Sequence, residues 1–500
     1  MSEIILATIN AKWIHPSLAL RLLKANLGDL EEQCEILEFA LRQPLREKLE
    51  PILAARPRIL ALSVSIWNHT ATLELLKALE EVWRNYEQPA ARDSGDNPGL
   101  KPELQPLVVL GGPEVSWLPE DAEIFRHTDY VIRGEGEEIF SSLCHEVFSG
   151  KREPEKFINS GGTTVDPGKI ASPYRLYTEE DLRRKLVYVE ASRGCPFACE
   201  FCQGSVRSQG SVKPSRNEGG AGQPVREFPL EPFLADMAAL IERGGRQFKF
   251  LDRTFNLNID RAKRIMEFFL DWIKTPKNGD NPCVHFEMVP ARFPSDLRVL
   301  IRRFPPGSLR LELGIQTFNP RTAAIIHRSG DAGEALEILE FLSRETSAIV
   351  HADLIAGLPG EDLASFGAGF DRLWQAMSKK GSPYGGEIQL GILKYLPGTP
   401  LARHNEAYGM KYSSAPPYEV IESSALGAAE LAQIKNFARF WETIVNRNPF
   451  PQLIPHILPP GEPSFGRFMT LSNQLLENFG RNWGIDRKRL ETYLQNFAAK

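Results

Sequence analysis

The sequence predicts an α/β protein with a doubly wound parallel sheet, a partial (β/α)6 barrel of the TIM type and a helical C-terminal cap. Strand and helix patterns alternate in the first 150 residues and again from residue 186 to residue 393. Helices of this length between strands imply parallel pairing, because each helix crosses over the sheet. The last hundred residues have helical periodicity without strand patterns. We therefore expect domains at 1–150, 178–403 and 404–500, with residues 151–177 as a linker.

Length and composition agree with a multidomain globular protein. A chain of 500 residues suggests two or three domains, and its 42% hydrophobic and 25% charged residues are ordinary values. The net charge of −5 gives no overall basic field that would attract nucleic acid or an anionic membrane. Residues 1–25 lack the features of a signal peptide, and no apolar run approaches ~18 residues. We expect a cytoplasmic protein without a membrane or nucleic-acid partner.

The first domain carries five strand patterns. They lie at 4–9, 36–41, 59–65, 107–110 and 130–132, with helical patterns at 17–27, at 70–83 and up to residue 148. A doubly wound sheet binds ligands beyond the carboxyl ends of its strands. Glycines in the turns at that edge let the backbone approach a ligand closely. Such turns occur in any fold of this kind, so a ligand site and a purely structural role both remain open.

The second domain repeats the strand–helix unit six times. Strands are expected at 186–191, 247–251, 284–289, 309–315, 349–355 and 387–393, with helices near 230–243, 260–273, 295–303, 320–328 or 332–344, and 361–378. In such a barrel, reactive groups sit at the carboxyl ends of the strands. Two stretches rich in glycine, proline and polar residues, 88–106 and 207–226, are expected to be exposed loops. The second is expected to be disordered, and a lid beside the cluster is the alternative.

The C-terminal segment is expected to form helices at 418–446, 465–479 and 487–497, with residues 452–463 broken by prolines. The first of these helices has an apolar stripe, which is typical of a packing face. The stripe consists of Leu431, Ile434, Phe437, Ala438, Trp441 and Val445.

Three closely spaced cysteines follow the first strand of the second domain. Cys195, Cys199 and Cys202 have the spacing C-x-x-x-C-x-x-C, and the other three cysteines are distant in the chain. Thiolates are the natural ligands of iron–sulfur clusters, in which a cubane ordinarily takes four. A cubane held by three thiolates leaves one iron open, as a catalytic metal requires. A zinc site would need a fourth ligand, and no histidine lies between His145 and His285.

The run Arg193-Gly194-Cys195-Pro196-Phe197-Ala198-Cys199-Glu200-Phe201-Cys202 resembles the signature of the radical S-adenosylmethionine (radical SAM) enzymes. The resemblance implies a 4Fe–4S cluster whose open iron is chelated by the amino and carboxylate groups of SAM, with Phe201 near the adenine. In that family, one electron from the cluster cleaves SAM to methionine and a 5′-deoxyadenosyl radical, which abstracts hydrogen from an unactivated carbon. A reducing partner such as flavodoxin or ferredoxin would supply the electron.

The first domain resembles the cobalamin-binding domain that precedes many radical SAM enzymes, a Rossmann-like sheet. The resemblance rests on residues 13–20, 108–113 and 134–137. The first domain lacks the Asp-x-His-x-x-Gly pattern that supplies a histidine to cobalt in other cobalamin proteins. We therefore expect that no histidine binds the cobalt, and that His15 is structural or lies near the edge of the corrin. The residues that the resemblance places around cobalamin are Asn10, His15, Ser63, Ser65, Gly111, Gly112, Pro113, Gly134, Glu135, Gly136 and Glu137.

Polar residues and glycine turns near the ends of the barrel strands resemble stretches of cobalamin-dependent radical enzymes. A buried carboxylate or amide needs a partner, which a cofactor or a neighbouring side chain can supply. Lys394 and Tyr395 are candidates to face a substrate, and packing is the alternative. The candidates to bind SAM are Phe201, Asp252, Asn256, Glu312, Gln316, Arg328, Asp353, Gly357, Pro359 and Gly360.

Together these resemblances predict methyl transfer to an unactivated carbon or to phosphorus. A cyclisation or rearrangement assisted by cobalamin is the alternative within the same class of enzyme. A non-catalytic binding protein stabilised by a metal is the alternative from another class. The C-terminal segment is similar to the uncharacterised C-terminal domain of one cobalamin-dependent radical SAM subfamily, and this similarity implies no substrate.

Overall fold

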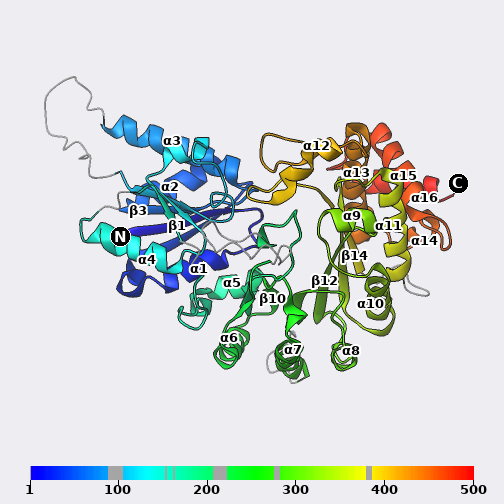
Figure 1. Cartoon of the computed structure of the whole chain (residues 1–500), viewed down its shortest axis with the longest axis horizontal. Coiled ribbons are helices and arrows are strands. Elements are labelled where there is room, and N and C mark those ends of the chain that lie inside the picture. The colour runs from blue at the N-terminus through cyan, green and yellow to red at the C-terminus, as the bar shows by residue number, and fades with distance from the viewer. Residues whose placement is uncertain are drawn as a thin grey trace. The chain divides into compact units, whose positions relative to one another are not determined.

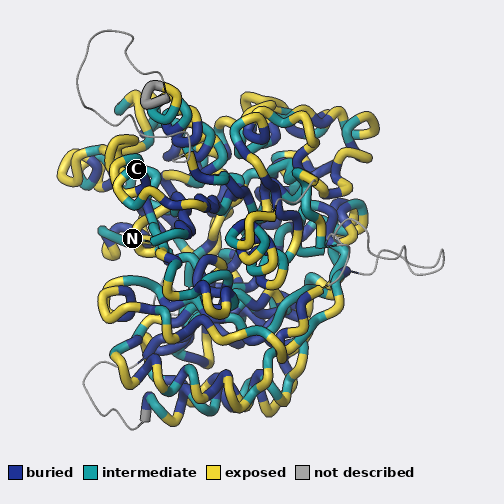
Figure 2. The backbone as a smooth tube through the Cα atoms, turned by 90° about the vertical axis from the view of Figure 1, so that its left-hand side faces the viewer, coloured by how far each residue is buried: buried dark blue, intermediate teal, exposed yellow. Residues whose placement is uncertain are grey.

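The computed structural model describes residues 2–87, 105–151, 155–160, 164–205, 222–274, 282–378 and 386–499. The predicted loops at 88–106 and 207–226 lie largely outside these ranges. The chain divides into two compact units, which are described separately. Unit 1 comprises Met1–Ala191, Val206–Gly220 and Val225–Lys249, and unit 2 comprises Ser192–Ser205, Ala221–Pro224 and Phe250–Lys500. Buried and exposed residues alternate along the peripheral helices (Figure 2).

Unit 1 contains a six-stranded parallel sheet with the order β2-β1-β3-β4-β5-β6. Residues Ile4 to Ala7 of β1 are fully buried, as expected for a central parallel strand covered on both faces. The strand order reverses between β1 and β3, which makes the carboxyl edge there the switch point of the sheet. The strands are β1 (Ile4–Asn10), β2 (Cys34–Ala40), β3 (Ile59–Ser63), β4 (Leu107–Gly111), β5 (Tyr130–Arg133) and β6 (Phe157–Asn159).

Helices cover both faces of this sheet, so the predicted doubly wound fold is confirmed (Figure 1). Leu20 of α1 and Phe140 of α4 pack on one face. Ile52 of α2 and Leu75 of α3 pack on the other. Ser17 caps α1 by accepting the Leu20 N–H at 3.2 Å. The helices of unit 1 are α1 (Leu18–Ala25), α2 (Leu45–Ala55), α3 (His69–Glu87), α4 (Glu137–Phe148), α5 (Glu179–Arg184) and α6 (Leu230–Glu242).

A buried ion cluster joins α1, β2 and α5. The Arg21 guanidinium lies 3.1 Å from Glu38 and 2.9 Å from Asp181, and the Lys185 ammonium lies 2.9 Å from Asp181. Two acids and two bases balance one another, which buried charges require. The cluster fixes the segment after the predicted linker against the first sheet.

The second sheet has the order β14-β13-β12-β11-β10-β7. Helices alternate with its strands, as the barrel prediction requires, and both alternatives given for the fourth helix form as separate helices (Figure 1). These elements are β7 (Val187–Val189), β10 (Gln247–Phe250), α7 (Ile259–Lys274), β11 (Cys283–Met288), α8 (Ser295–Arg302), β12 (Leu309–Gln316), α9 (Pro320–Ile325), α10 (Ala332–Glu345), β13 (Ile349–Ala356), α11 (Leu363–Met377) and β14 (Gly386–Ile392). Two short strands, β8 (Ser192–Arg193) and β9 (Arg226–Glu227), pair separately.

The C-terminal segment is mainly helical, but its first long helix starts later than predicted. Residues 418–427 form β16 and a turn, and α13 begins after Gly427, whose N–H donates to Glu430 Oε2 at 2.9 Å. The elements are α12 (Asn405–Tyr408), β15 (Lys411–Tyr412), β16 (Val420–Glu422), α13 (Ala428–Trp441), a π-helical turn η8 (Glu442–Asn446), α14 (Ile454–Ile457), α15 (Ser464–Phe479) and α16 (Arg487–Ala498).

The predicted apolar stripe of α13 is a packing face. Phe437 packs against Phe370 of α11 and Phe465 of α15, with ring centroids 5.2 and 5.0 Å apart. The Asn446 side chain pairs with both the N–H and the carbonyl of Ile388, at 3.2 and 3.0 Å. Because β14 is an edge strand, this pairing occupies backbone groups that would otherwise be open to another strand.

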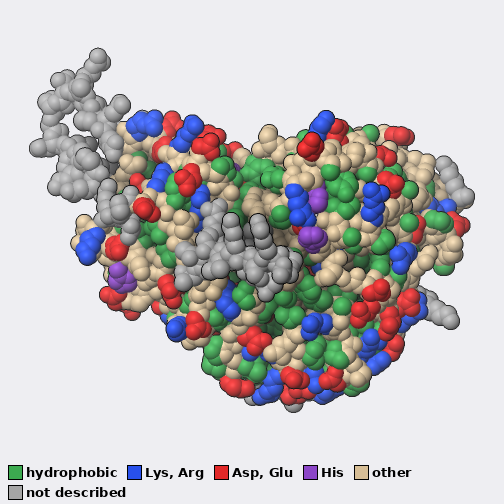
Figure 3. Space-filling view, viewed as in Figure 1, with side chains coloured by type: hydrophobic (Ala, Val, Ile, Leu, Met, Phe, Trp, Pro, Cys, Tyr) green, Lys and Arg blue, Asp and Glu red, His purple; other side chains and the backbone are tan. Residues whose placement is uncertain are grey.

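Acidic and basic side chains are interspersed on the face drawn in Figure 3, in agreement with the small net charge. In the part of the chain that the structure describes, no helix is both long enough and apolar enough to cross a membrane.

Candidate functional site

The three predicted cluster ligands lie on one loop of unit 2, between β8 and the short helix η5 (Gln203–Ser205). All three are free thiols; Cys199 is buried, whereas Cys195 and Cys202 are partly exposed. The Cys202 N–H donates to the Cys199 carbonyl at 3.2 Å, and the Ser205 hydroxyl lies 2.7 Å from the carbonyls of both cysteines. This tight turn fixes two of the thiols relative to each other.

A guanidinium packs against this cysteine loop. Arg328 donates to the Cys199 sulfur at 3.6 Å and to the Gly314 carbonyl of β12. The Glu200 N–H donates to the Ile326 carbonyl at 3.1 Å, so the segment after α9 runs along the loop. Arg328 therefore places a cationic side chain in direct contact with one of the predicted cluster ligands.

The donor set suits an iron–sulfur cluster better than a single metal ion. Among the described residues, no group of three or more His, Cys, Asp or Glu side chains has the arrangement that would hold a single metal ion such as zinc. The thiolates of a cubane each bind a different iron and need not converge. Burial raises the pKa of the Cys195 thiol.

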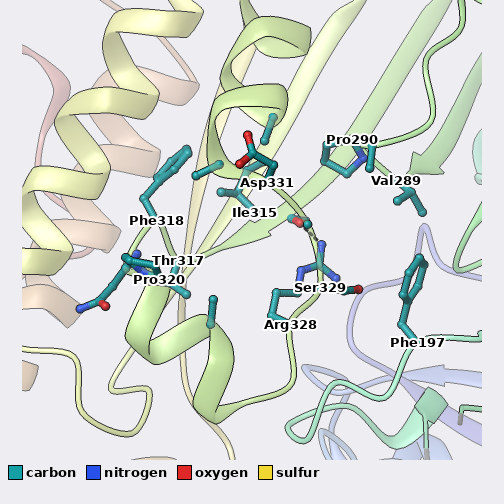
Figure 4. A pocket seen from close by; sticks show the side chains of 17 residues that line it. Phe197, Val289, Pro290, Ile315, Thr317, Phe318, Pro320, Arg328, Ser329 and Asp331 are labelled. Atoms are coloured by element: carbon teal, nitrogen blue, oxygen red, sulfur yellow. Dashed lines mark hydrogen bonds between the residues drawn. The ribbon is translucent and has the colours of Figure 1, made fainter. Parts of the chain in front are cut away.

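A cavity of about 210 Å³ opens beside Arg328. Figure 4 shows Arg328 and Ser329 on the segment between α9 and α10, with Phe197 of the cysteine loop on one side and Phe318 on the other. The loop after β11 contributes Val289 to the lining. Complete ligand sites usually occupy roughly 300–1,000 Å³. The cavity therefore suits part of a ligand, and Arg328 and Asp331 bring side chains of opposite charge to its lining.

The predicted residue Gln316 stands at a bulge at the end of β12. Its φ is +72°, in the left-handed region that residues other than glycine rarely adopt. The pairing of β12 with β13 shifts between Gly314 and Gln316. A Cβ on Gly314 would lie 2.5 Å from the Gln316 Nε2 atom, so the end of the Gln316 side chain would have to move. Strained backbone of this kind gathers at functional sites and re-aims a side chain.

Glu312 belongs to a polar row across the second sheet. Strand register places Glu287, Glu312, His351 and Glu387 side by side on β11 to β14. Glu312 Oε2 lies 3.1 Å from His285 Nε2, and the His285 and His351 rings stack with centroids 5.1 Å apart. These groups place carboxylates and imidazoles next to one another on one face of the sheet.

Two of the other predicted SAM residues are engaged with the protein. Asp252 is buried and accepts the Ser192 hydroxyl at 2.6 Å. The fully buried Asn256 donates to the carbonyls of Val289 and Arg292 at 3.0 and 2.7 Å and accepts the Val289 N–H at 2.7 Å. Asn256 therefore anchors the loop after β11, which lines the cavity.

The glycine turn after β13 is explained by packing. Gly357 and Gly360 have φ values of +86° and +78°. A side chain on Gly357 would lie 2.5 Å from Val420, and one on Gly360 would lie 3.2 Å from Tyr408. Both contacts are made to residues of the C-terminal segment, so the turn lets that segment approach closely.

The remaining candidates of unit 2 are dispersed. Phe201 is partly exposed next to Cys202, Asp353 lies on β13 in register with Gly314, and Pro359 is buried. Lys394 forms a β-bridge with Glu419, and the Tyr395 ring lies 5.2 Å from the Tyr412 ring. Their predicted contacts with SAM or a substrate stay predictions.

Sequence reasoning missed two buried carboxylates near the loop. Glu200 contacts His327, Arg403 and His404, and burial followed by the charges of Arg403 and His327 lowers the pKa of His404. Glu361 accepts the Thr317 hydroxyl at 2.6 Å, and burial raises its pKa to about 7. Glu200 occupies an unspecified position inside the cysteine motif, and its partners lie more than 100 residues away, so no local pattern revealed them.

In unit 1, an unpredicted asparagine organises the switch point of the sheet. Asn68 is fully buried; it donates to the carbonyls of Ile9 and Ser63 at 3.0 and 3.1 Å and accepts the Ser65 N–H at 2.7 Å. It thereby ties the end of β1, where Asn10 lies, to the turn after β3. Asn68 lies five residues after the end of β3, directly before α3, so the sequence indicated only the start of a helix there.

Neighbouring atoms approach both glycine turns at this edge closely. Gly112, between Gly111 and Pro113, has φ +108°, and a side chain there would lie 2.6 Å from the Val64 carbonyl oxygen. Gly134 has φ +95°, and a side chain there would lie 2.6 Å from Ser160 Oγ. In the second turn, Glu135 pairs with Arg226, a side chain on Gly136 would lie 3.2 Å from Leu23, and Glu137 is buried.

Aromatic side chains surround the end of β1. His15 Nδ1 lies 2.7 Å from the Tyr188 hydroxyl, with the two rings stacked. Burial, followed by the charges of Lys12 and Lys249, lowers the pKa of His15, so the ring is neutral near pH 7. Trp13 and Trp67, after β1 and β3, are 46% and 52% exposed. Large exposed apolar side chains at a switch point suit a flat, apolar ligand.

Comparisons with known proteins agree with this arrangement. A model described as the radical SAM superfamily matches residues 189–372, and a model described as a protein of unknown function (DUF4080) matches residues 406–500. An uncharacterised methyltransferase of Pyrococcus horikoshii is 28% identical over 176 residues, which cover 31% of this chain and 35% of that protein. The chain thus matches about a third of the length of this curated relative.

Two solved structures share the fold over most of the chain. The cobalamin-dependent S-adenosylmethionine radical enzyme OxsB, with aqua-cobalamin and SAM bound, has a TM-score of 0.62 at 12% identity, covering 99% of this chain and 78% of OxsB. The radical SAM methyltransferase TsrM from Kitasatospora setae, with cobalamin and a 4Fe–4S cluster bound, has a TM-score of 0.58 at 16% identity, covering 83% of this chain and 78% of TsrM. The chain therefore contains a segment that matches the radical SAM superfamily, residues 189–372, followed by a segment that matches DUF4080, residues 406–500.

Proposed function

We propose that the chain is a cobalamin-dependent radical SAM methyltransferase acting on an unactivated carbon or on phosphorus. The observation that carries the proposal is the loop of three free thiols whose buried member, Cys199, is contacted by Arg328. The fold shared with OxsB and TsrM, whose structures hold cobalamin with SAM or with a cluster, supports it. When bound, the cluster and SAM supply radical chemistry, and cobalamin supplies a transferable methyl group.

In this proposal, unit 2 holds the cluster and SAM. Cys195, Cys199 and Cys202 bind three irons. Arg328 binds the methionine carboxylate, because its guanidinium matches a carboxylate and borders the cavity. Glu312 and Gln316 lie within the same strand and contact the rest of SAM. Of the other candidates, Phe201 lies near the adenine, and Asp252 positions Ser192 beside the loop.

Unit 1 holds cobalamin at the carboxyl edge of its sheet. Trp13 and Trp67 offer exposed apolar surface to the corrin, and the glycine turns leave room at the same edge. His15 is held by Tyr188, which supports cobalt binding without a histidine ligand. We propose that the domains have the boundaries predicted from the sequence, and that the candidate residues at these turns contact cobalamin.

Product balance tests the proposed reaction. The protein is reconstituted without oxygen with iron, sulfide and cobalamin, reduced, and supplied with SAM and candidate substrates, and its nucleosides are measured by mass spectrometry. Matched amounts of 5′-deoxyadenosine and S-adenosylhomocysteine are expected for methyl transfer. Turnover that yields 5′-deoxyadenosine without S-adenosylhomocysteine would instead favour cyclisation or rearrangement. A folded protein that neither binds nor cleaves SAM would be a non-catalytic binding protein.

Replacing Trp67 with alanine is expected to weaken cobalamin binding about tenfold, or about 1.4 kcal/mol, because a large exposed ring is lost from the corrin surface. Binding of hydroxocobalamin is followed by equilibrium dialysis and visible absorption. Trp483→Ala, at a 65% exposed tryptophan in unit 2, is the matched control and should leave the affinity unchanged. Equal affinity in the wild type and Trp67→Ala would remove Trp67 from the cobalamin site.

A further inference from the structure

Glu200 is a buried carboxylate inside the cysteine loop. It lies between the ligand Cys199 and Phe201, and its side chain is only 2% exposed. A charge removed from water in this way must be paired, or the loop would be destabilised by several kcal/mol.

Three basic side chains from two segments provide the pairing. His327, after α9, places Nδ1 2.9 Å from Glu200 Oε1. His404, at the end of the short helix η7 (Pro400–His404), places Nε2 2.6 Å from Oε2. Arg403 from the same helix contacts Oε1. Arginine stays protonated at any accessible pH, so Arg403 is a permanent counter-charge.

The same arrangement holds the group that contacts the cluster ligand. His327 immediately precedes Arg328, which donates to the Cys199 sulfur, and the Glu200 N–H donates to Ile326 in the same segment. Glu200 thus connects the cysteine loop to the segment that carries Arg328 and to η7. Glu200 and His404 are shielded from solvent, whereas the side chains of Arg403 and His327 are 49% and 51% exposed, so solvent screens part of the field of these two groups.

We propose that the buried Glu200 and the half-exposed Arg403 form a charge pair that positions the cysteine loop and sets the reduction potential of its cluster. This inference rests on the proposed function, because it requires a cluster on the loop. One electron, donated by dithionite in the test, takes a 4Fe–4S cluster from the 2+ to the 1+ state and adds one negative charge. The negative Glu200 carboxylate therefore disfavours this reduction, and the positive Arg403 guanidinium favours it. Glu200 is a positioning residue that acts through the loop.

The two charges predict shifts of opposite sign. Glu200→Gln should raise the midpoint potential, because Arg403 is left uncompensated. Arg403→Gln should lower it, because a positive charge beside the carboxylate is removed. A tenfold change in the ratio of reduced to oxidised cluster is expected in each case, which corresponds to about 59 mV for a one-electron couple. The double variant should return close to the wild-type potential.

The potentials are measured on reconstituted protein by a dithionite titration with redox mediators, followed by electron paramagnetic resonance. Glu340→Gln and Arg344→Gln break an exposed ion pair on α10, 2.9 Å apart in the wild type, and should leave the potential unchanged. Arg403→Lys keeps the charge while altering the geometry and should stay near the wild-type value.

The outcomes separate this inference from the proposed function. Absence of a cluster in the wild type would overturn the proposed function itself. A wild-type cluster with single-variant shifts that are absent or of the same sign would overturn only the charge-pair proposal. If Glu200→Gln fails to retain iron, recovery of iron in the double variant supports the proposal, and failure to recover it overturns the proposal.

Discussion

Replacing Cys199 with alanine is expected to reduce bound iron from about four atoms per chain to a small fraction and to abolish reductive cleavage of SAM. A cubane held by only two remaining thiolates loses a ligand on a second iron. Cys199 has the largest expected effect of the three cysteines, because it is the buried one and it receives the Arg328 contact. Iron and sulfide are assayed after anaerobic reconstitution, and cleavage is assayed as 5′-deoxyadenosine formed.

Cys144→Ala is the matched control for this experiment. Cys144 is fully buried in α4 of unit 1, and burial raises the pKa of its thiol, as expected of an inert core cysteine. This variant should keep its full complement of iron. Stoichiometric zinc with negligible iron in wild-type protein prepared without oxygen would contradict both the cluster and the proposed reaction.

The alternation of elements was predictable because each strand and helix carries its own periodicity. The six strands of the second sheet lie within two residues of the predicted ranges at either end. The sequence did not reveal α2, whose pattern is interrupted by Pro51, or β6, a three-residue edge strand inside the predicted linker. Tertiary pairing with β5 creates β6, and this pairing leaves no local signal.

The candidate site likewise contains features that a local sequence pattern reveals and features that only tertiary contacts create. The cysteine loop is contiguous, so its ligands could be identified from spacing alone. The partners of Glu200 come from positions 327, 403 and 404, and they meet it only in the folded chain. Gly357 and Gly360 were expected to approach a ligand, yet their close contacts are with Val420 and Tyr408. A glycine turn in a sequence indicates a close approach without identifying the approaching group.

Substitution of Glu361 by glutamine is expected to stabilise the cofactor-free protein at alkaline pH. The Glu361 side chain is buried, with Oε1 bonded to Thr317 and Oε2 without a partner among the described residues. Burial raises its pKa from 4.5 in the unfolded chain to about 7 in the folded protein. The folded state therefore binds this proton more tightly, and the stability that the proton provides is lost as the pH rises from about 4.5 through about 7.

This increase in the pKa of Glu361 corresponds to a change of about 3 kcal/mol in the free energy of unfolding between the acidic and the alkaline limit. Glutamine keeps the shape and accepts the Thr317 hydroxyl without carrying a charge, so the stability of Glu361→Gln relative to the wild type should increase between pH 5 and pH 8. Unfolding is measured by urea titration at both pH values. Glu340→Gln, at an exposed position on α10, is the control, and its difference in stability from the wild type should be the same at pH 5 and at pH 8. A stability difference for Glu361→Gln that does not change with pH would mean that this carboxyl is already ionised below pH 5 in the folded protein.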